Sequence, residues 1–331
     1  MAGRVHSLDY LKLLMALFVA LGHSGVLTAD VSVTKFVIGN GILRNAVPVF
    51  SLVSGYFLHA VVMRGKGRAW LRKALWLYSF WFAVYLAWAL IVAPEWLMPN
   101  LSTPRAVAGL YVWGYLHLWY VVGLFVAGAM VLAMLRLGRA TGWGHGPLVV
   151  LAVFCAVAGC VMEYLSITGT WPIPTHRYRN GIFIIYPFAA LGYLLADRVA
   201  RQGLAGLPRA RVMGPLAGAA LVLMMAEAWL VARNYGIGNE QFTEIPVSAY
   251  LCAPAAFVFF LRMNLPRPVL NLGYLSAAIY FLHAMIEVTA GEMGVANPYM
   301  VFLLGVAVPC VAALLLRGAR NGRRPRPDPA P

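Results

Sequence analysis

The sequence predicts an all-α protein that crosses a membrane about ten times, with both ends of the chain in the cytoplasm. Of its 331 residues, 62% are hydrophobic and only 11% are charged, and the mean hydropathy is +0.76. A soluble domain carries about a quarter charged residues. Apolar stretches of about 20 residues, enough to cross a hydrocarbon core about 30 Å thick, recur along the whole chain. A membrane β-barrel would show short alternating segments instead, and none are evident.

The basic residues predict the orientation. The chain has 26 Lys and Arg against 11 Asp and Glu, a formal net charge of +15. Most of the cations fall on alternate connections between the expected helices and at the C-terminal end of the chain. Because cytoplasmic connections are enriched in Lys and Arg, this bias places both termini inside. The charge is therefore mainly a topology signal, and no nucleic-acid partner is expected.

The expected helices are delimited by hydropathy and composition. In chain order they cover residues 7–27, 40–63, 70–93, 115–136, 147–167, 180–196, 213–233, 246–262, 271–290 and 298–317. Together they predict one integral-membrane domain, residues 1–317. Residues 318–331 are basic and Pro-rich, which predicts a disordered cytoplasmic tail attracted to anionic membrane lipids.

The first helix, "LDYLKLLMALFVALGHSGVL", carries three ionisable residues. Lys12 and His23 are 11 positions apart, so on a helix they differ by about 20° in direction and by about 16 Å along the axis. Asp9 lies one turn before Lys12 and is placed to pair with it. This polar stripe is expected to face protein rather than lipid, and His23 lies so deep that it is a functional candidate by default. The alternative for Asp9 and Lys12 is an interfacial ion pair, with the lysine reaching the headgroups.

Few other ionisable residues lie at membrane depth. His283 and Glu287 share one face of the ninth helix, either as functional groups or as a structural pair between helices. His117 lies in "YLHLWYV" with Trp119, where aromatic residues ordinarily form an interfacial belt. Glu163 and Glu227 lie in the fifth and seventh helices. Most of these groups fall toward the outer half, which predicts a polar cavity open to the outside.

The connection "RGKGRAWLRK" gathers five cations on the inner face. The orientation signal alone accounts for most of them, but a polyanionic ligand would need the same residues, because phosphates are bound by Arg and Lys. The four cysteines all fall in expected helices and have neither a disulfide-framework nor a metal-site spacing, so they are expected to be packing residues, and no metal is expected.

Six segments resemble the integral-membrane acyltransferase family 3, whose members O-acylate sugars and other hydroxyl acceptors. The first is the opening helix, where in the family ten residues separate a basic residue, usually arginine, from a histidine, as ten residues separate Lys12 from His23. The other five, in family order, are "VPVFSLVSGYFL" (47–58), "RAWLRKALWLYSFW" (68–81), "HLWYVVGLF" (117–125), "RNGIFIIYPFAALGYLL" (179–195) and "LGYLSAAIYFLHAMI" (272–286). The chain departs from the family pattern at two places. Lysine stands at position 12 instead of the commoner arginine, and the arginines of the basic connection "RGKGRAWLRK" match the family spacing only loosely.

The resemblance implies a sugar O-acyltransferase in the inner membrane of a bacterium, with acyl-CoA, most often acetyl-CoA, as the donor from the cytoplasm. It implies that His23 is the catalytic base, or a transient acyl carrier, with Lys12 and Asp9 beside the donor path. The residues then expected to bind acyl-CoA are Arg68, Arg72, Lys73, Ser54, Gly55 and Tyr56. The residues expected to bind the acceptor, a glycan or lipid-linked sugar, are His117, Trp119, Arg179, Tyr280, His283 and Glu287.

Several alternatives stay open at this point. Gly55 could serve close helix packing, and the run from Pro48 could be a broken helix that lines the site. Arg179 could be a charged helix cap. For the whole chain, a transporter or flippase of a sugar-type substrate is the alternative function, and a ligand-sensing membrane domain is a third. The sequence does not indicate the oligomeric state.

Overall fold

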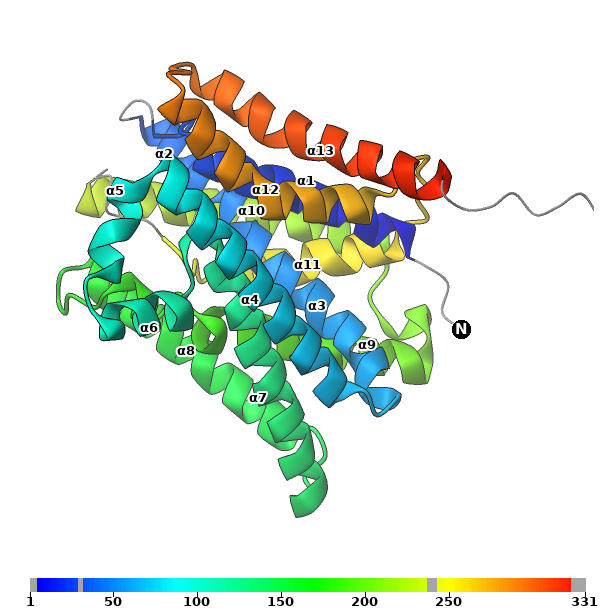
Figure 1. Cartoon of the computed structure of the whole chain (residues 1–331). Coiled ribbons are helices and arrows are strands. Elements are labelled where there is room, and N and C mark those ends of the chain that lie inside the picture. Colours follow the sequence, from blue (N-terminus) through cyan, green and yellow to red (C-terminus); the bar gives the residue numbers. More distant parts are fainter. Residues whose placement is uncertain (1–4, 29–31, 237–242, 323–331) are drawn as a thin grey trace, which may run out of the picture.

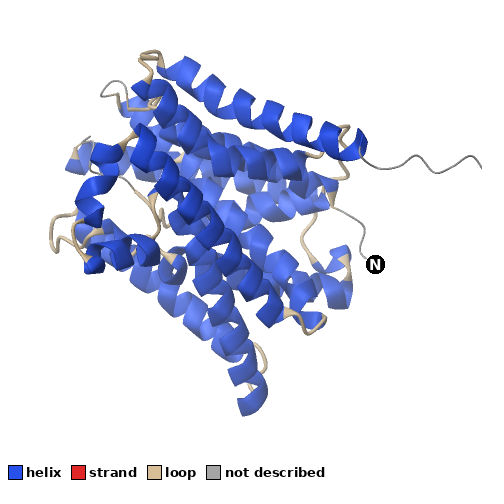
Figure 2. Cartoon of the chain, in the orientation of Figure 1, coloured by secondary structure: helices blue, strands red, loops and turns tan. Residues whose placement is uncertain are grey.

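The computed structural model describes residues 5–28, 32–236 and 243–322. Within these residues the chain forms helices joined by loops and turns, with no strand (Figure 2). The predicted all-α fold is therefore confirmed. Each of the ten expected spans coincides with a long helix or with a helix interrupted near one end.

The long helices occupy the predicted ranges with small shifts at their ends. Their bounds are α1 (His6–His23), α3 (Ala46–Met63), α4 (Gly67–Val92), α7 (Trp119–Thr141), α8 (Gly146–Ile167), α9 (Tyr186–Gln202), α10 (Ala210–Tyr235), α11 (Ala249–Arg262), α12 (Leu272–Glu292) and α13 (Pro298–Gly322). Shorter helices lie in the connections: α2 (Val33–Asn40), α5 (Pro94–Leu97) and α6 (Pro104–Trp113).

Eight helical segments of the described chain are long and apolar enough to cross a membrane. The helices α1 and α11 are not among them: α11 has only 14 residues, and α1 contains Asp9, Lys12 and His23. Both bury apolar side chains against other helices, for example Leu11 and Met15 of α1 and Phe257 of α11. Their more polar or shorter sequences are compatible with a membrane protein because protein, rather than lipid, surrounds much of their surface.

The helices pack in an order that brings distant parts of the chain together. In Figure 1, α13 lies against α12, α12 lies beside α1, and α3 packs on α9, with α7 and α8 beyond them. The beginning of α1 and the end of α13 lie on the same side of the bundle (Figure 1). The same side holds the start of α12, so α1 and α12 run in parallel and their last turns lie together.

Close packing of α3 on α9 depends on two glycines. A Cβ on Gly55 would come within 1.9 Å of the Ala189 carbonyl oxygen, and one on Gly192 would come within 2.1 Å of the Leu52 carbonyl oxygen. Small residues of this kind let two membrane helices approach backbone to backbone. The structure thus gives Gly55 a packing role between these helices.

The second expected span is broken at a different place from the one considered in the sequence. The helix α2 ends at Asn40, a short 3₁₀ turn (Ile42–Asn45) follows, and α3 then runs without interruption to Met63. Pro48 stands in the first turn of α3, where its missing N–H is not needed for a helical hydrogen bond. The break therefore precedes Pro48.

At the C-terminal end, α13 continues to Gly322, so the first five residues of the predicted tail are helical. Residues 323–331, the rest of that tail, lie outside the described residues.

Candidate functional site

A cavity of about 370 Å³ opens at the end of α1 that holds His23. It lies between the last turns of α1, the broken segment α2–α3, the start of α7 and the residues just before α9. Its wall combines apolar side chains with a small number of charged and polar groups, as ligand sites generally do. The members of the wall with a polar atom in the side chain are His23, Thr28, Ser32, Lys35, Asn40, Arg44, His117, Trp119, Tyr120, Arg179, Glu244 and Tyr280.

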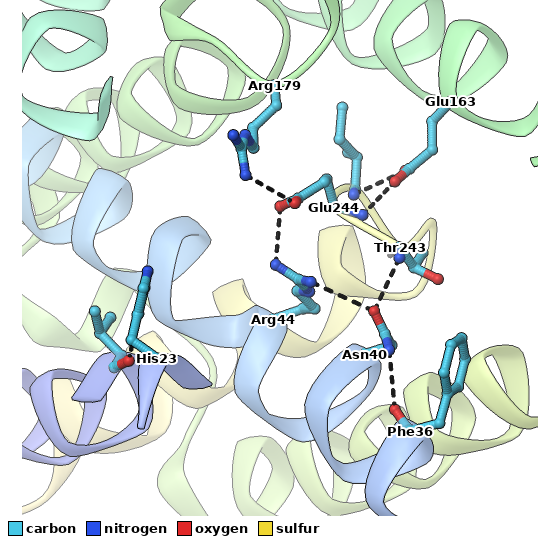
Figure 3. Close-up of polar contacts among 10 residues, drawn as sticks. His23, Phe36, Asn40, Arg44, Glu163, Arg179, Thr243 and Glu244 are labelled. Atoms are coloured by element: carbon cyan, nitrogen blue, oxygen red, sulfur yellow. Dashed lines mark hydrogen bonds and ion pairs between the residues drawn. The ribbon is translucent and has the colours of Figure 1, made fainter. Parts of the chain in front are cut away.

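His23 is held in one tautomer. Its Nδ1 lies 2.8 Å from the carbonyl oxygen of Val19. Because a carbonyl oxygen only accepts hydrogen bonds, Nδ1 carries the proton and the lone pair is on Nε2. Figure 3 shows the His23 side chain on the same side of the site as Arg44. His23 therefore presents a basic nitrogen at the wall of the cavity.

Two further histidines lie against His23. The ring centroid of His283 is 5.2 Å from that of His23 and 4.8 Å from that of His117. His283 donates from Nδ1 to the carbonyl oxygens of Ile279 and Tyr280, both at 2.9 Å, so its lone pair is also on Nε2. Among the described residues, no group of three or more His, Cys, Asp or Glu side chains is arranged to hold a metal ion.

Tyr280 fixes the position of His117. Its hydroxyl donates to the His117 carbonyl oxygen at 2.9 Å, and the two rings meet edge to face. The imidazole nitrogens of His117 have no hydrogen-bond partner among the described residues, although the side chain is buried. A buried polar group without a partner costs about 1–3 kcal/mol, so these nitrogens are suited to a ligand or water that enters the cavity.

An ion-paired group forms the opposite wall. Glu244 accepts from Arg44 at 2.9 Å and from Arg179 at 3.1 Å (Figure 3). Asn40 accepts from Arg44 at 3.4 Å and from the backbone N–H of Thr243 at 2.9 Å. Three segments that are far apart in the sequence, residues 40–44, 179 and 243–244, are thereby joined at the cavity.

Two carboxylates, the buried Glu163 and the half-buried Glu227, position the segment that carries Glu244. Glu163 accepts from the backbone N–H groups of Glu244 and Ile245, the second at 2.7 Å. Glu227 accepts from the N–H groups of Val247 and Ser248, at 2.7 and 2.9 Å. Charge-assisted bonds of this kind are among the stronger ones in proteins. These two carboxylates therefore act on the site through Glu244.

A second cavity, of about 620 Å³, shares part of this wall. His23, Thr28, Trp119 and Arg179 line both cavities. The second cavity adds Glu287, whose side chain is 4% exposed and whose two carboxylate oxygens have no hydrogen-bond partner among the described residues. The helix α13 passes directly over this carboxylate, since a Cβ on Gly305 would come within 2.4 Å of Oε1.

The predicted acceptor residues thus converge on one place. His117, Trp119, Arg179 and Tyr280 line the first cavity with His23, His283 contacts His23, and Glu287 lines the second cavity.

The residues expected to meet the donor do not line these cavities. Lys12 pairs with Asp9 at 2.6 Å and lies 6.0 Å from the Phe57 ring centroid, in the other half of α1. Tyr56 packs on Phe257, and the Ser54 hydroxyl lies 3.4 Å from that of Tyr120. Arg68, Arg72 and Lys73 are exposed on the first turns of α4.

The sequence alone did not single out Asn40, Arg44 and Glu244 as site residues. The available signal was local: Asn40 and Arg44 are spaced by four residues at the edge of an apolar span, where polar side chains are costly. Nothing local connects them with Glu244.

A family model described as an acyltransferase domain matches residues 5–317 of the chain. No curated protein and no solved structure matches the chain. The match covers every helix that contributes to the two cavities.

Proposed function

Because the chain belongs to the integral-membrane acyltransferase family 3, we propose that it is an O-acyltransferase whose base is His23. It transfers an acyl group, acetyl in the simplest case, from cytoplasmic acyl-CoA to a hydroxyl group of a sugar or glycan. The observation that carries the proposal is the basic Nε2 of His23, fixed by the Val19 carbonyl, at the wall of a cavity lined by polar and aromatic groups.

A sugar hydroxyl is a weak nucleophile at neutral pH and needs a base within hydrogen-bond reach. In the proposed reaction Nε2 of His23 takes the hydroxyl proton while the oxygen attacks the thioester carbonyl carbon. The C–S bond then breaks, and the CoA sulfur takes the proton back from His23. The ester and free CoA are the products, and the histidine returns to its neutral form.

The second form of the mechanism makes His23 an acyl carrier. Nε2 attacks the thioester, CoA leaves, and the acyl group on the imidazole is passed to the acceptor hydroxyl in a later step. Trapping an acylated His23 in the absence of acceptor supports this form. CoA release that always requires acceptor supports the general-base form.

On the donor side, we propose that Arg68, Arg72 and Lys73 bind the phosphates of CoA. Their exposure at the start of α4 supports this, because guanidinium and ammonium groups bind phosphate from solution. Lys12 lies about 16 Å and Asp9 about 21 Å before His23 along α1, so a pantetheine arm would have to pass them to reach the base.

The test uses the full chain in nanodiscs with acetyl-CoA and a panel of glycans, and measures free CoA and acceptor mass. We expect acceptor-dependent CoA release in the wild type and a loss of at least 10²-fold in His23→Gln, the size of a typical general-base contribution. The control is His176→Gln, because His176 is exposed and lines neither cavity. His176 lies between two membrane-spanning segments, and burial together with Arg177 and Arg179 lowers its pKa.

Equal activity of the two histidine variants would refute the role of His23. If several acyl-CoAs are not consumed with any acceptor, while a sugar crosses the membrane through the protein, a transporter is the better description.

A further inference from the structure

The first cavity has an uneven distribution of charge. Among its lining residues that the structure describes, three are basic, Lys35, Arg44 and Arg179, and one is acidic, Glu244. Glu244 accepts hydrogen bonds from two of these three cations, Arg44 and Arg179.

Of the two arginines that pair with Glu244, Arg179 is the more accessible. One of its N–H groups donates to Glu244 at 3.1 Å, and its Cζ lies 5.3 Å from the Trp119 ring centroid. Its side chain is nevertheless 37% exposed, against 7% for Glu244, and it lines both cavities together with His23. A guanidinium has five N–H donors in a rigid fork, and the contact with Glu244 is the one hydrogen bond that the Arg179 side chain makes among the described residues.

A positive charge at the mouth of a cavity between apolar helices is stabilised by an anion that reaches it. The planar fork of arginine matches the two oxygens of a carboxylate or phosphate and forms two parallel hydrogen bonds with them. Trp119 and Glu244 hold the Arg179 side chain from two sides, which reduces the conformational entropy that binding would otherwise cost.

Building on the function proposed above, we propose that the acceptor carries an anionic substituent, a sugar carboxylate or a phosphate, which Arg179 binds. The anion is held at the junction of the two cavities, and this contact presents a hydroxyl of the same acceptor to Nε2 of His23. Arg44, on the other side of Glu244, adds positive potential on the same wall. Arg179 is thus a specificity-determining residue for an acidic acceptor.

Binding is tested without turnover. The full chain in nanodiscs is titrated calorimetrically with glucuronate, glucose 1-phosphate and glucose at low and high salt. We expect at least one of the two anionic sugars to bind about tenfold or more tightly than glucose, with the preference falling as salt rises. A preference for glucuronate identifies a carboxylate, and a preference for glucose 1-phosphate identifies a phosphate.

Variants at position 179 test whether Arg179 causes the preference for anionic sugars. We expect Arg179→Gln to lose the preference and Arg179→Lys to keep part of it, because lysine keeps the charge but not the fork. The control is Arg233→Gln: its Cζ lies 5.2 Å from the Trp229 ring in the same type of contact, but the residue lines neither cavity. An unchanged melting temperature of Arg179→Gln shows that the variant is folded.

The outcomes separate this inference from the proposed function. If glucose binds as tightly as the anionic sugars, or Arg179→Gln keeps the preference, the inference is overturned even when acyl transfer is observed. The same holds if charge selectivity follows the acyl group, with succinyl-CoA preferred over acetyl-CoA and neutral acceptors used equally well. If an anionic sugar binds through Arg179 but no acceptor is acylated, the anion site stands and the acyltransferase proposal fails.

Discussion

At the scale of single residues, the site depends on side chains that hold other side chains. His23 is oriented by a backbone carbonyl one turn away, so the helix itself selects the tautomer. Arg44 and Arg179 are placed by Glu244, which is placed in turn by Glu163 through two backbone N–H groups. The chemistry of the cavity thus depends on a buried carboxylate that does not line it.

Replacement of Glu163 tests this dependence. In Glu163→Gln an amide NH₂ group faces a backbone N–H, so one buried donor loses its acceptor and the protein loses about 1–3 kcal/mol of stability. We expect a lower melting temperature in detergent and weaker binding of acceptor, because Glu244 is no longer held in place. Glu95→Gln, an exposed carboxylate in a connecting helix, is the control and should match the wild type. Equal melting temperatures for both variants would contradict the assigned role of Glu163.

Local and distant residue pairs differ in how well the sequence predicts them. The Asp9–Lys12 pair and the functional position of His23 follow from spacing along one helix, and the structure has the pair at 2.6 Å. The contacts of Glu244 join it to residues 200 and 65 positions away, and no periodicity in the sequence connects them. They depend on how α2, α9 and the segment before α11 pack, which only the folded structure determines.

At the scale of helices, α3 and α9 approach each other backbone to backbone. The segment "SGY" resembles a family motif and was expected to contact the donor. In the structure its glycine faces the backbone of Ala189, and this contact alone is sufficient to exclude a side chain there. The packing alternative is therefore supported for Gly55, while a donor role for Ser54 and Tyr56 stays a prediction.

The substitution Gly55→Ala tests how much the close packing of α3 on α9 contributes to stability. Gly55→Ala should destabilise the protein by about 1–3 kcal/mol, because the backbones of α3 and α9 must move apart to accept it. Gly218→Ala is the matched control: Gly218 lies on α10 with nothing within 4 Å of the added Cβ, so the change should be neutral or slightly stabilising. Thermal unfolding in one detergent compares the two, and a Gly55→Ala variant as stable as the control would refute the packing role.

At the scale of the whole molecule, hydropathy and the charge bias predicted the number, order and approximate bounds of the helices. This succeeded because each membrane span must satisfy its own backbone hydrogen bonds and bury its own apolar surface. The short helices α2, α5 and α6 were not predicted, because they are too short for a spanning signal. The start of α1 and the end of α13 lie on one side, as an even number of crossings requires (Figure 1).

The predicted orientation can be measured by labelling single introduced cysteines with a membrane-impermeant maleimide. Thr170→Cys lies in the connection after α8 and should react in intact cells. Lys66→Cys lies between α3 and α4 and should react only after lysis, because its connection is rich in cations. The wild type gives the background of the four native cysteines, which all lie in helices. The reverse labelling pattern would place the two cavities on the cytoplasmic side.

The wall shared by the two cavities has a consequence for inhibition. His23, Thr28, Trp119 and Arg179 belong to both cavities, so a fragment bound in one is separated from a fragment bound in the other by no more than these side chains. A short linker past His23 makes the second binding step intramolecular, with an effective concentration in the millimolar range. Two weak fragments joined in this way can gain roughly 10²–10⁴-fold in affinity without any new contact. The linker itself would lie beside the His23 ring, whose Nε2 is the proposed base.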